Sequence, residues 1–204
     1  MVPPGRAFLR RLIDLTIGLS KPHYYRRLNK EARSDIQAWL VESFNGKCLC
    51  LSDRWETSEQ LNLNTDASNI GYGGLFRKHW FAIKWPTDWL KYHITIRELF
   101  PIVVAIQLWG IALSNKCITF FTDKLGVVHI INKQSSKDPT IMKLVRKFVV
   151  LTLQFNILFK AVHIPGIKNT AADHLSRLQI QKFREEFPLM NPLPIVNSVD
   201  IPQL

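Results

Sequence analysis

The stretch from Leu61 to Phe76, LNLNTDASNIGYGGLF, carries the clearest structural pattern in the sequence. Apolar or β-branched residues alternate with polar ones up to Asp66, and this period of two predicts a half-buried strand from Leu61 to Asp66. The glycines at positions 71, 73 and 74 argue against a strand interior and predict a tight reversal there. Asp66 then ends a strand, where its carboxylate can reach the sheet edge. Taken alone, the stretch fits equally well a simple hairpin with an aspartate at its mouth.

The remaining chain mixes strand-like and helix-like segments. An antiparallel meander is followed by alternating strands and helices, which predicts an α/β fold with one mixed five-stranded sheet and helices on both faces. The predicted strands are KCLCL (47–51), residues 61–66, one or two within GLFRKHWFAIKWP (74–86), CITFFTD (117–123) and ILFKAVHIPG (157–166). The predicted helices are 94–113, 124–134, 139–155 and 169–183, the last with Asn169 as its N-cap.

Both ends of the chain differ in character from its middle. Residues 6–19 predict an amphipathic helix with a basic face, and a second helix is predicted from an N-cap at Asn29 to about residue 44. Two such helices have too few apolar positions for a core of their own. We therefore expect them to pack on the outside of the following domain and to add no catalytic group. The tail from Pro188, with three further prolines, predicts a linker.

Charge and cysteine content limit the classes of partner and the cellular compartment that we expect for this chain. The chain has 27 Lys and Arg against 16 Asp and Glu, a net charge of +11, which favours a polyanionic partner such as nucleic acid over a membrane; a merely solvated basic surface is the alternative. Cys48, Cys50 and Cys117 are too few and too irregularly spaced for a disulfide framework or a zinc site. This predicts a reducing compartment, cytoplasm or nucleus, rather than secretion. We find no signal peptide and no run long enough to span a bilayer.

Four carboxylates stand at strand ends or in the first turns of helices: Asp66, Glu98, Asp123 and Asp173. Each has a structural explanation, because Thr95-x-x-Glu98 matches a capping box, Asp173 suits the positive end of a helix, and Asp123 suits a turn. Strand ends and the helix starts that follow them gather at one edge of such a sheet. We therefore expect the four carboxylates to converge in one solvent-accessible cleft.

Four clustered acids repel one another unless cations neutralise them. Oxygen ligands without a Cys or His pattern suit Mg²⁺ or Mn²⁺ rather than Zn²⁺. Two such ions about 4 Å apart activate a water and stabilise the leaving oxygen in phosphodiester hydrolysis. The excess of positive charge elsewhere would hold a polyanionic substrate.

The sequence motifs around these acids resemble those of a known protein family. TDAS-x-x-GYGG, the Glu of RELF, FTD and ADHLSR, with the acids 32, 25 and 50 residues apart, resemble the ribonuclease H domain of retroelement reverse transcriptases. The phrases HIPGIKNTAADHLSR, VVHIINKQSSKDPTIMKL and RRLIDLTIG…YRRLNKEARSDIQAWL are more particularly similar to DIRS-like retrotransposons, and more distantly to Gypsy-type elements. The resemblance covers about Arg6 to Pro188.

This resemblance implies a ribonuclease H-like fold and a metal-dependent endonuclease that cuts the RNA strand of RNA–DNA hybrids, within a retrotransposon polyprotein. Residues 1–58 would be the helical connection after a reverse-transcriptase thumb, 59–180 the ribonuclease H-like domain, and 181–204 a proline-bearing linker tail. A reverse-transcriptase polymerase domain would be a further partner. No YxDD motif is present, so the chain by itself is not expected to synthesise DNA.

The resemblance also implies roles for individual residues. Asp66 would bridge two Mg²⁺ or Mn²⁺ ions, with Glu98 and Asp123 completing one site and Asp173 the other. Nucleic-acid contacts, with solvated surface charge as the alternative for the basic ones, are implied for Ala67, Ser68 and Gly71 near the ribose 2′-hydroxyl, for Asn169, and for Arg177 and the basic segment after Asn132 near phosphates.

One departure from the family pattern stands beside a catalytic acid. Lys124 follows Asp123 where the retroelement pattern has Asn or Ser. If the strand continues past Asp123, the lysine points away from the site, and if a turn begins there it can swing inward. We expect the first arrangement and weak activity. His163 and His174 are interpreted as structural.

Two other functions remain open. A nucleic-acid-binding remnant that keeps the fold without turnover is favoured by Lys124. A transposase or integrase on the same type of fold is disfavoured by Glu98, because those enzymes typically lack a Glu on the helix after the meander.

Overall fold

The computed structural model of the 204-residue chain describes residues 6–21, 23–43, 54–164 and 169–195. The predicted strand at 47–51, the end predicted for the second helix near residue 44, and Cys48 and Cys50 lie outside these ranges. The elements in chain order are α1 (Arg6–Thr16), α2 (Lys30–Ser43), β1 (Trp55–Thr57), β2 (Leu63–Ala67), β3 (Gly71–Phe76), β4 (His79–Lys84), a 3₁₀ turn (Thr87–Trp89), α3 (Ile94–Trp109), β5 (Cys117–Thr122), α4 (Leu125–Lys133), α5 (Pro139–Gln154), β6 (Leu158–His163), α6 (Thr170–Ser176) and α7 (Ile180–Glu186).

The strands form two three-stranded sheets, and the prediction of one five-stranded sheet is wrong. One sheet is antiparallel, in the order β2-β3-β4, and the other is parallel, in the order β1-β5-β6. The unpredicted strand β1 and Ser58 occupy the edge of β5. The Ser58 amide donates to the Thr119 carbonyl (2.8 Å), and the Ser58 hydroxyl accepts from the Phe121 amide (3.0 Å). Because these backbone groups of β5 are already paired, β2 begins a separate ladder, joined to Ser58 by the Leu63 amide (2.8 Å).

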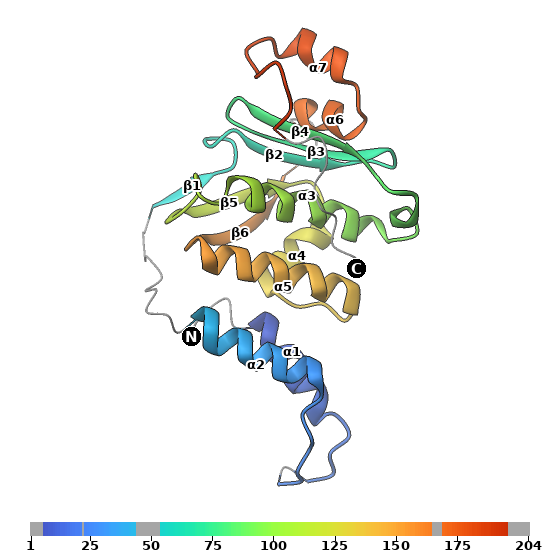
Figure 1. Ribbon diagram of the computed structural model, residues 1–204, viewed down its shortest axis with the longest axis vertical. Coiled ribbons are helices and arrows are strands. Elements are labelled where there is room, and N and C mark those ends of the chain that lie inside the picture. Colours follow the sequence, from blue (N-terminus) through green and yellow to red (C-terminus); the bar gives the residue numbers. More distant parts are fainter. Residues whose placement is uncertain (1–5, 22, 44–53, 165–168, 196–204) are drawn as a thin grey trace.

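The sheets and helices are layered along the long axis of the molecule (Figure 1). Helices α6 and α7 cover one face of the β2-β3-β4 sheet and α3 lies against its other face, so the prediction of helices on both faces is confirmed. Helices α4 and α5 pack with α3 and the parallel sheet, and α1 and α2 lie beyond α5 at the lower end. None of the helices in the described part of the chain is long and apolar enough to cross a bilayer.

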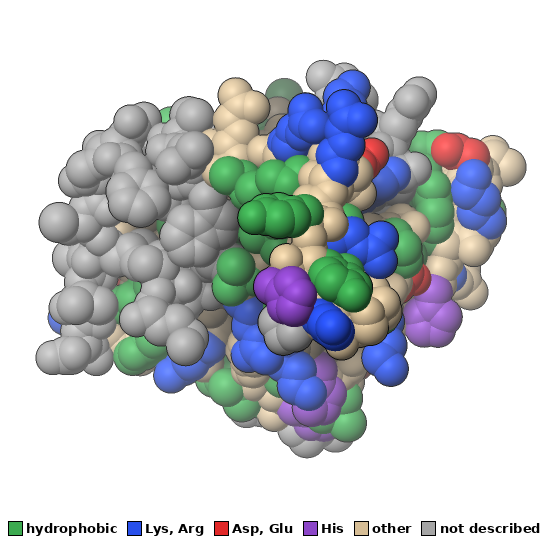
Figure 2. All heavy atoms as spheres, turned by 90° about the horizontal axis from the view of Figure 1, so that it is seen from below, with side chains coloured by type: hydrophobic (Ala, Val, Ile, Leu, Met, Phe, Trp, Pro, Cys, Tyr) green, Lys and Arg blue, Asp and Glu red, His purple; other side chains and the backbone are tan. Residues whose placement is uncertain are grey.

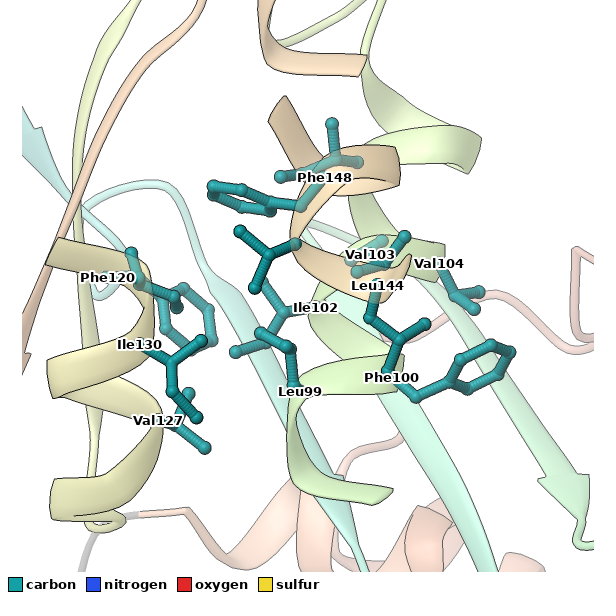
Figure 3. Packing of buried hydrophobic residues seen from close by; sticks show 14 of the residues in the cluster. Leu99, Phe100, Ile102, Val103, Val104, Phe120, Val127, Ile130, Leu144 and Phe148 are labelled. Atoms are coloured by element: carbon teal, nitrogen blue, oxygen red, sulfur yellow. The ribbon is translucent and has the colours of Figure 1, made fainter. Parts of the chain in front are cut away.

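The main core lies where α3, α4 and α5 meet. Figure 3 shows side chains of α3, among them Leu99 and Ile102, packed with Phe120 of β5, with Ile130 of α4 and with Phe148 of α5. All five are buried, and burying a side chain of this size contributes about 2 kcal/mol. Helix α3 is apolar nearly all round because it has the sheet on one side and α5 on another.

The glycines of β3 lie inside a strand, so the predicted reversal at positions 71 to 74 is wrong. The reversal occurs earlier, where Ser68 and Gly71 are joined by a backbone hydrogen bond of 2.9 Å. A Cβ atom on Gly73 would lie 2.5 Å from the Cβ of Leu175 in α6. Glycine is therefore required here for the close approach of a helix to the strand, which is the use of strand glycines that the sequence alone does not distinguish from a turn.

The C-terminal part of the chain also differs from the prediction. The single helix expected over 169–183 is two helices, separated at Leu178, whose φ of +57° is left-handed. The linker predicted for 181–204 is helical through Glu186 in its first part, and Phe183 is fully buried. Beyond α7, the Asn191 carbonyl accepts a hydrogen bond of 2.7 Å from the Trp80 indole. The segment that was predicted to be a linker, because of its prolines, therefore packs against β4.

Helices α1 and α2 pack against the outer side of α5, as predicted for an N-terminal extension. The predicted cap is confirmed, because the Asn29 side chain accepts a 2.8 Å hydrogen bond from the Ala32 amide. Asp35 of α2 is buried between two cations: Arg11 Nη1 of α1 lies 3.0 Å and Arg146 Nε of α5 lies 3.3 Å from its carboxylate oxygens. One carboxylate therefore ties three helices together.

Candidate active site

The four predicted carboxylates come from four separate segments and lie along two adjoining hollows. Asp66 is in β2, Glu98 in α3, Asp123 directly after β5, and Asp173 in the first turn of α6. Asp66, Glu98 and Asp123 line a cavity of about 50 Å³. Asp66, Asp123 and Asp173 line a more open hollow of about 360 Å³. The fold thus brings the acids of four distant segments to one edge of the molecule, with Asp66 and Asp123 common to both hollows.

Asp66 is held by the last turn of α6. Its Oδ2 accepts a hydrogen bond of 2.6 Å from the hydroxyl of Ser176, a residue that is fully buried. Burial raises the pKa of Asp66, the Ser176 hydrogen bond opposes this, and the nearby negative charge of Asp173 adds to the rise. The carboxylate is thus fixed in direction while its charge remains poorly compensated.

Glu98 is the most buried of the four carboxylates, with 8% of its surface exposed. Burial, followed by the negative charge of Asp66, raises its pKa to about 8. The capping-box explanation for this residue fails, because the N-cap of α3 is His93, whose Nδ1 accepts from the Thr95 amide (3.2 Å). A capping role therefore does not account for Glu98.

Lys124 points into the site, and the prediction that it points away is wrong. Its Nζ lies 3.0 Å from Asp123 Oδ2 and 3.7 Å from Glu98 Oε1. Strand β5 ends at Thr122, so Asp123 and Lys124 belong to the turn that leads into α4, where strand alternation no longer applies. Partial burial acts to lower the pKa of Lys124, but the hydrogen bond to Asp123 and the charge of Glu98 outweigh it and raise the pKa. The lysine is a built-in counter-ion for two of the four acids.

Asp173 has its own cation. Both of its carboxylate oxygens accept hydrogen bonds from Arg177 Nε, at 2.8 and 3.0 Å, across one turn of backbone. These interactions raise the pKa of Arg177. Arg177, a candidate for phosphate contacts, is therefore engaged with a carboxylate. Both side chains are about half exposed, so the pair is open to solvent and to exchange of partners.

The donor chemistry of the cluster suits Mg²⁺ or Mn²⁺, but its geometry does not. All four side chains offer carboxylate oxygens, the ligands that hard divalent cations prefer. Among the described residues, however, no group of three or more Asp, Glu, His or Cys side chains is close enough to hold a metal ion. The ammonium group of Lys124 stands between Asp123 and Glu98, and Arg177 engages Asp173. As arranged, these side chains do not fit a two-metal centre.

The turn beside Asp66 is built by internal contacts. The Ser68 hydroxyl donates to the Ser176 carbonyl (2.8 Å) and accepts from the Ile70 amide (2.9 Å). The Ser68 carbonyl accepts from the Trp85 indole (3.0 Å) and from Arg97, which also contacts the Asn69 side chain (3.1 Å). Arg97 is 8% exposed and anchors the turn from below.

The residues proposed for nucleic-acid contact are therefore placed unequally. Ala67 and Gly71 are buried, Ser68 is committed to the turn, and the side chains of Asn69 and Ile70 at its tip are exposed. Asn169 stands at the N-cap position of α6 but makes no capping hydrogen bond; its Nδ2 donates to the Thr65 carbonyl (3.0 Å). It lines both hollows beside Asp66.

Three residues near the site were not found from the sequence as site residues. Ser176 lies in the word ADHLSR, three residues after Asp173, and that spacing on a helix was the available signal. Glu59, in the connection between β1 and β2, lines the small cavity. His163 at the end of β6 lines a third hollow with Glu98 and Lys124, although the sequence suggested a structural role. His174 does act structurally, because its ring contacts Gln179 and Glu186 around α7.

Comparisons with known proteins give few matches. No protein-family model matches the chain, and no curated protein matches it. Among solved structures, the chain is similar to the N-terminal RNase H domain of Rv2228c from Mycobacterium tuberculosis, solved as a fusion with maltose-binding protein. The two share 16% sequence identity with a TM-score of 0.41, over 61% of this chain and 94% of that chain.

Proposed function

We propose that this chain is a ribonuclease H-like nuclease that hydrolyses the RNA strand of RNA–DNA hybrids. The observation that carries the proposal is the gathering of Asp66, Glu98, Asp123 and Asp173 along two adjoining hollows. These acids sit in the words TDAS, RELF, FTD and ADHLSR, which resemble the ribonuclease H domains of retroelement reverse transcriptases. The net charge of +11 supports a polyanionic substrate.

The retroelement context is part of the same proposal. The N-terminal helices would follow a reverse-transcriptase thumb, and a polymerase domain of the DIRS-like type would be the partner. Leu9 and Ile13 of α1, 44% and 52% exposed, form an apolar stripe that suits contact with such a domain. None of the described side chains of α1 and α2 lines either hollow at the acidic edge.

The proposed cofactors are two Mg²⁺ or Mn²⁺ ions, held by the four carboxylates. Their binding requires the ammonium of Lys124 to leave Asp123 and Glu98, and Arg177 to release Asp173. The side chains of Lys124 and Arg177 are 40% and 51% exposed, so water can solvate both cations once they leave the acids. The buried Ser176 hydroxyl holds Asp66 in place meanwhile.

The test is a cleavage assay on a hybrid with a labelled RNA strand, with Mg²⁺ and with Mn²⁺. We expect slow cleavage that leaves 3′-hydroxyl and 5′-phosphate ends, no cleavage of single-stranded RNA or of duplex DNA, and none with Asp66→Asn. Cleavage that persists in Asp66→Asn would assign the activity to a contaminant.

A second candidate function is a nucleic-acid-binding remnant without turnover, and one observation favours it. Lys124 Nζ contacts two of the four acids and so supplies the charge that a metal ion would bring. The two candidates separate on the variant Lys124→Asn. Cleavage that appears only in the variant assigns a blocked nuclease, whereas hybrid binding without cleavage in both proteins assigns the remnant.

A further inference from the structure

The segment between α1 and α2 projects from the molecule and carries exposed basic and aromatic side chains. We call its described residues, 17–21 and 23–29, the basic arm. It extends from the lower end of the molecule in Figure 1, whereas Asp66 belongs to the β2-β3-β4 sheet in the upper half. Every described residue from Lys21 to Asn29 is exposed. The arm is thus far from the acidic edge and contributes nothing to it.

The arm has ordered attachments at both ends. Gly18 turns the chain out of α1 with a φ of +80°, a conformation that favours glycine. The Tyr24 amide donates to the Lys21 carbonyl (3.2 Å). At the other end Arg33 Nε donates to the Leu28 carbonyl (3.2 Å) and Asn29 caps α2. The tip, His23 to Arg27, lies between these two attached ends and is exposed.

The tip presents aromatic rings to solvent. Tyr25 is fully exposed, at 103%, and Tyr24 is 48% exposed, with the His23 ring edge-on to it at 5.3 Å. The three rings border an open hollow of about 630 Å³ together with Arg26. Aromatic side chains usually gain stability by burial, so rings left in water by a well-attached turn indicate a partner that covers them.

The charge around these rings has one sign. Between Asp14 and Glu31 the sequence has four Lys or Arg and no Asp or Glu. Among the described residues, no carboxylate lies within ion-pair distance of Lys21, Arg26 or Arg27. Figure 2, which shows this lower end, has Lys and Arg side chains beside apolar and His side chains and few acidic ones.

We infer that the basic arm is a binding site for single-stranded nucleic acid, separate from the acidic edge. Unpaired bases stack on tyrosine rings while flanking arginines contact the phosphates, a combination that tolerates any sequence. A duplex fits less well, because its bases are already stacked on one another. A protein partner would be expected to match an apolar surface, whereas here the exposed rings His23, Tyr24 and Tyr25 are followed directly by the positive charges of Arg26 and Arg27. The site does not depend on cleavage by the four carboxylates.

The test measures binding of the full chain to a labelled single-stranded oligonucleotide of about 16 residues by fluorescence anisotropy in EDTA. Tyr24→Ala/Tyr25→Ala is expected to weaken binding by at least about tenfold, and Tyr24→Phe/Tyr25→Phe to leave it nearly unchanged, since phenylalanine also stacks. Arg26→Ala/Arg27→Ala should reduce the slope of log affinity against log salt by about 1.4. The matched control Lys78→Ala/Lys84→Ala removes two exposed charges at the opposite end of the molecule and should change affinity least.

Four outcomes overturn the inference. The first is that removing the tyrosine pair changes affinity no more than the control does. The second is equal loss with the phenylalanine pair, which would assign the phenolic hydroxyls rather than the rings. The third is tighter binding to a duplex of the same length. The fourth is binding to vesicles of anionic lipid that the tyrosine-to-alanine pair abolishes while oligonucleotide binding is kept. Circular dichroism of each variant checks that the helices remain folded.

Discussion

Two charged clusters in this molecule are balanced in opposite ways. Between α1, α2 and α5, a single buried carboxylate, Asp35, faces two guanidinium groups. At the acidic edge, four carboxylates share the ammonium of Lys124 and the guanidinium of Arg177. The Asp35 cluster has a structural role, because it joins three helices. The second has more negative charge than the fold needs, in a chain whose net charge is +11.

The excess of negative charge at the acidic edge disfavours the charged carboxylates there, whereas the cations around Asp35 favour its charged form. Burial and neighbouring acids raise the pKa of both Asp66 and Glu98, so their charged forms are disfavoured in the folded protein. Burial raises the pKa of Asp35 as well, but there both neighbouring charges are positive and oppose the rise. Groups that destabilise a fold and still gather at a hollow are candidates for function. Four variants test this contrast.

Asp35→Ala should have the largest effect. It leaves Arg146, whose side chain is 12% exposed, without its ion-pair partner, and breaking a buried pair in this way costs about 3 kcal/mol. Urea unfolding measures the loss. The control Asp14→Ala removes an exposed partner of Arg10 within α1 and should cost under about 0.5 kcal/mol. A loss below about 1 kcal/mol for Asp35→Ala would show that the helices are held by apolar contacts alone.

Glu98→Gln should stabilise the metal-free protein, and more so at high pH. The pKa of Glu98 in the folded state, about 8, lies above its ordinary value of 4.5, so the folded state holds a proton that the unfolded state releases between these values. The free energy of unfolding therefore falls as the pH rises through this window. Glutamine removes the fall, and the variant should gain on the order of 2 kcal/mol relative to wild type between pH 5 and pH 8.5.

The measurement for Glu98→Gln is chemical denaturation in EDTA at the two pH values. The matched control is Glu185→Gln on α7, where the side chain is exposed. Equal pH dependence of wild type and Glu98→Gln would contradict the assignment of the effect to this buried carboxyl.

Lys124→Asn should tighten the binding of Mn²⁺ by about tenfold, or about 1.4 kcal/mol, because it removes the counter-ion that Asp123 and Glu98 now share. Isothermal titration with Mn²⁺ measures this without any substrate, and hybrid cleavage should rise in parallel. The control Lys182→Asn removes an exposed lysine of α7 outside both hollows. Unchanged Mn²⁺ affinity in Lys124→Asn would mean that the lysine does not compete with the metal.

Ser176→Ala should have the smallest effect, a loss of about 1 kcal/mol, because the Asp66 carboxylate loses a hydrogen bond of 2.6 Å. Without that bond the pKa of Asp66 should rise further, and an NMR titration of its carboxyl carbon would detect the change. Ser114→Ala, whose hydroxyl donates only to the Gly110 carbonyl, should cost less. A reversed order of the two losses would mean that the Asp66 contact does not contribute to stability.

Much of the fold followed from local patterns. The apolar run of α3, the β-branched and aromatic residues of β5 and the alternation in β2 each predicted the right element, because burial on one face or on all sides imposes its own period. The positions of Asp66, Asp123 and Asp173 near strand ends or in a first helical turn followed from the same patterns, whereas Glu98, predicted in the first turn of α3, lies just beyond it. Strand β1 was not predicted, since three residues carry too little periodicity to be recognised.

Where neighbours distant in the sequence decide, local patterns failed. The glycines of β3 suggested a turn, but their small size serves the approach of α6, which comes about a hundred residues later. The prolines of the tail suggested a linker, but the amides of Asn191 and Ile195 donate to the carbonyls of Lys78, just before β4, and of Trp80 in β4. In both cases the deciding contact is made by a segment about a hundred residues away, which a local sequence pattern does not include.

Sequence alone determined which residues of this protein carry charge near strand ends, and hence that an acidic edge would form on a basic chain. The packing of distant segments sets which side chains those carboxylates contact. Because β5 ends one residue before Asp123, Lys124 turns toward Glu98 of a different element instead of away from it. The direction of a side chain depends on where a strand stops, and that is set by pairing with β1 and β6, whose contacts the residues around Asp123 do not encode.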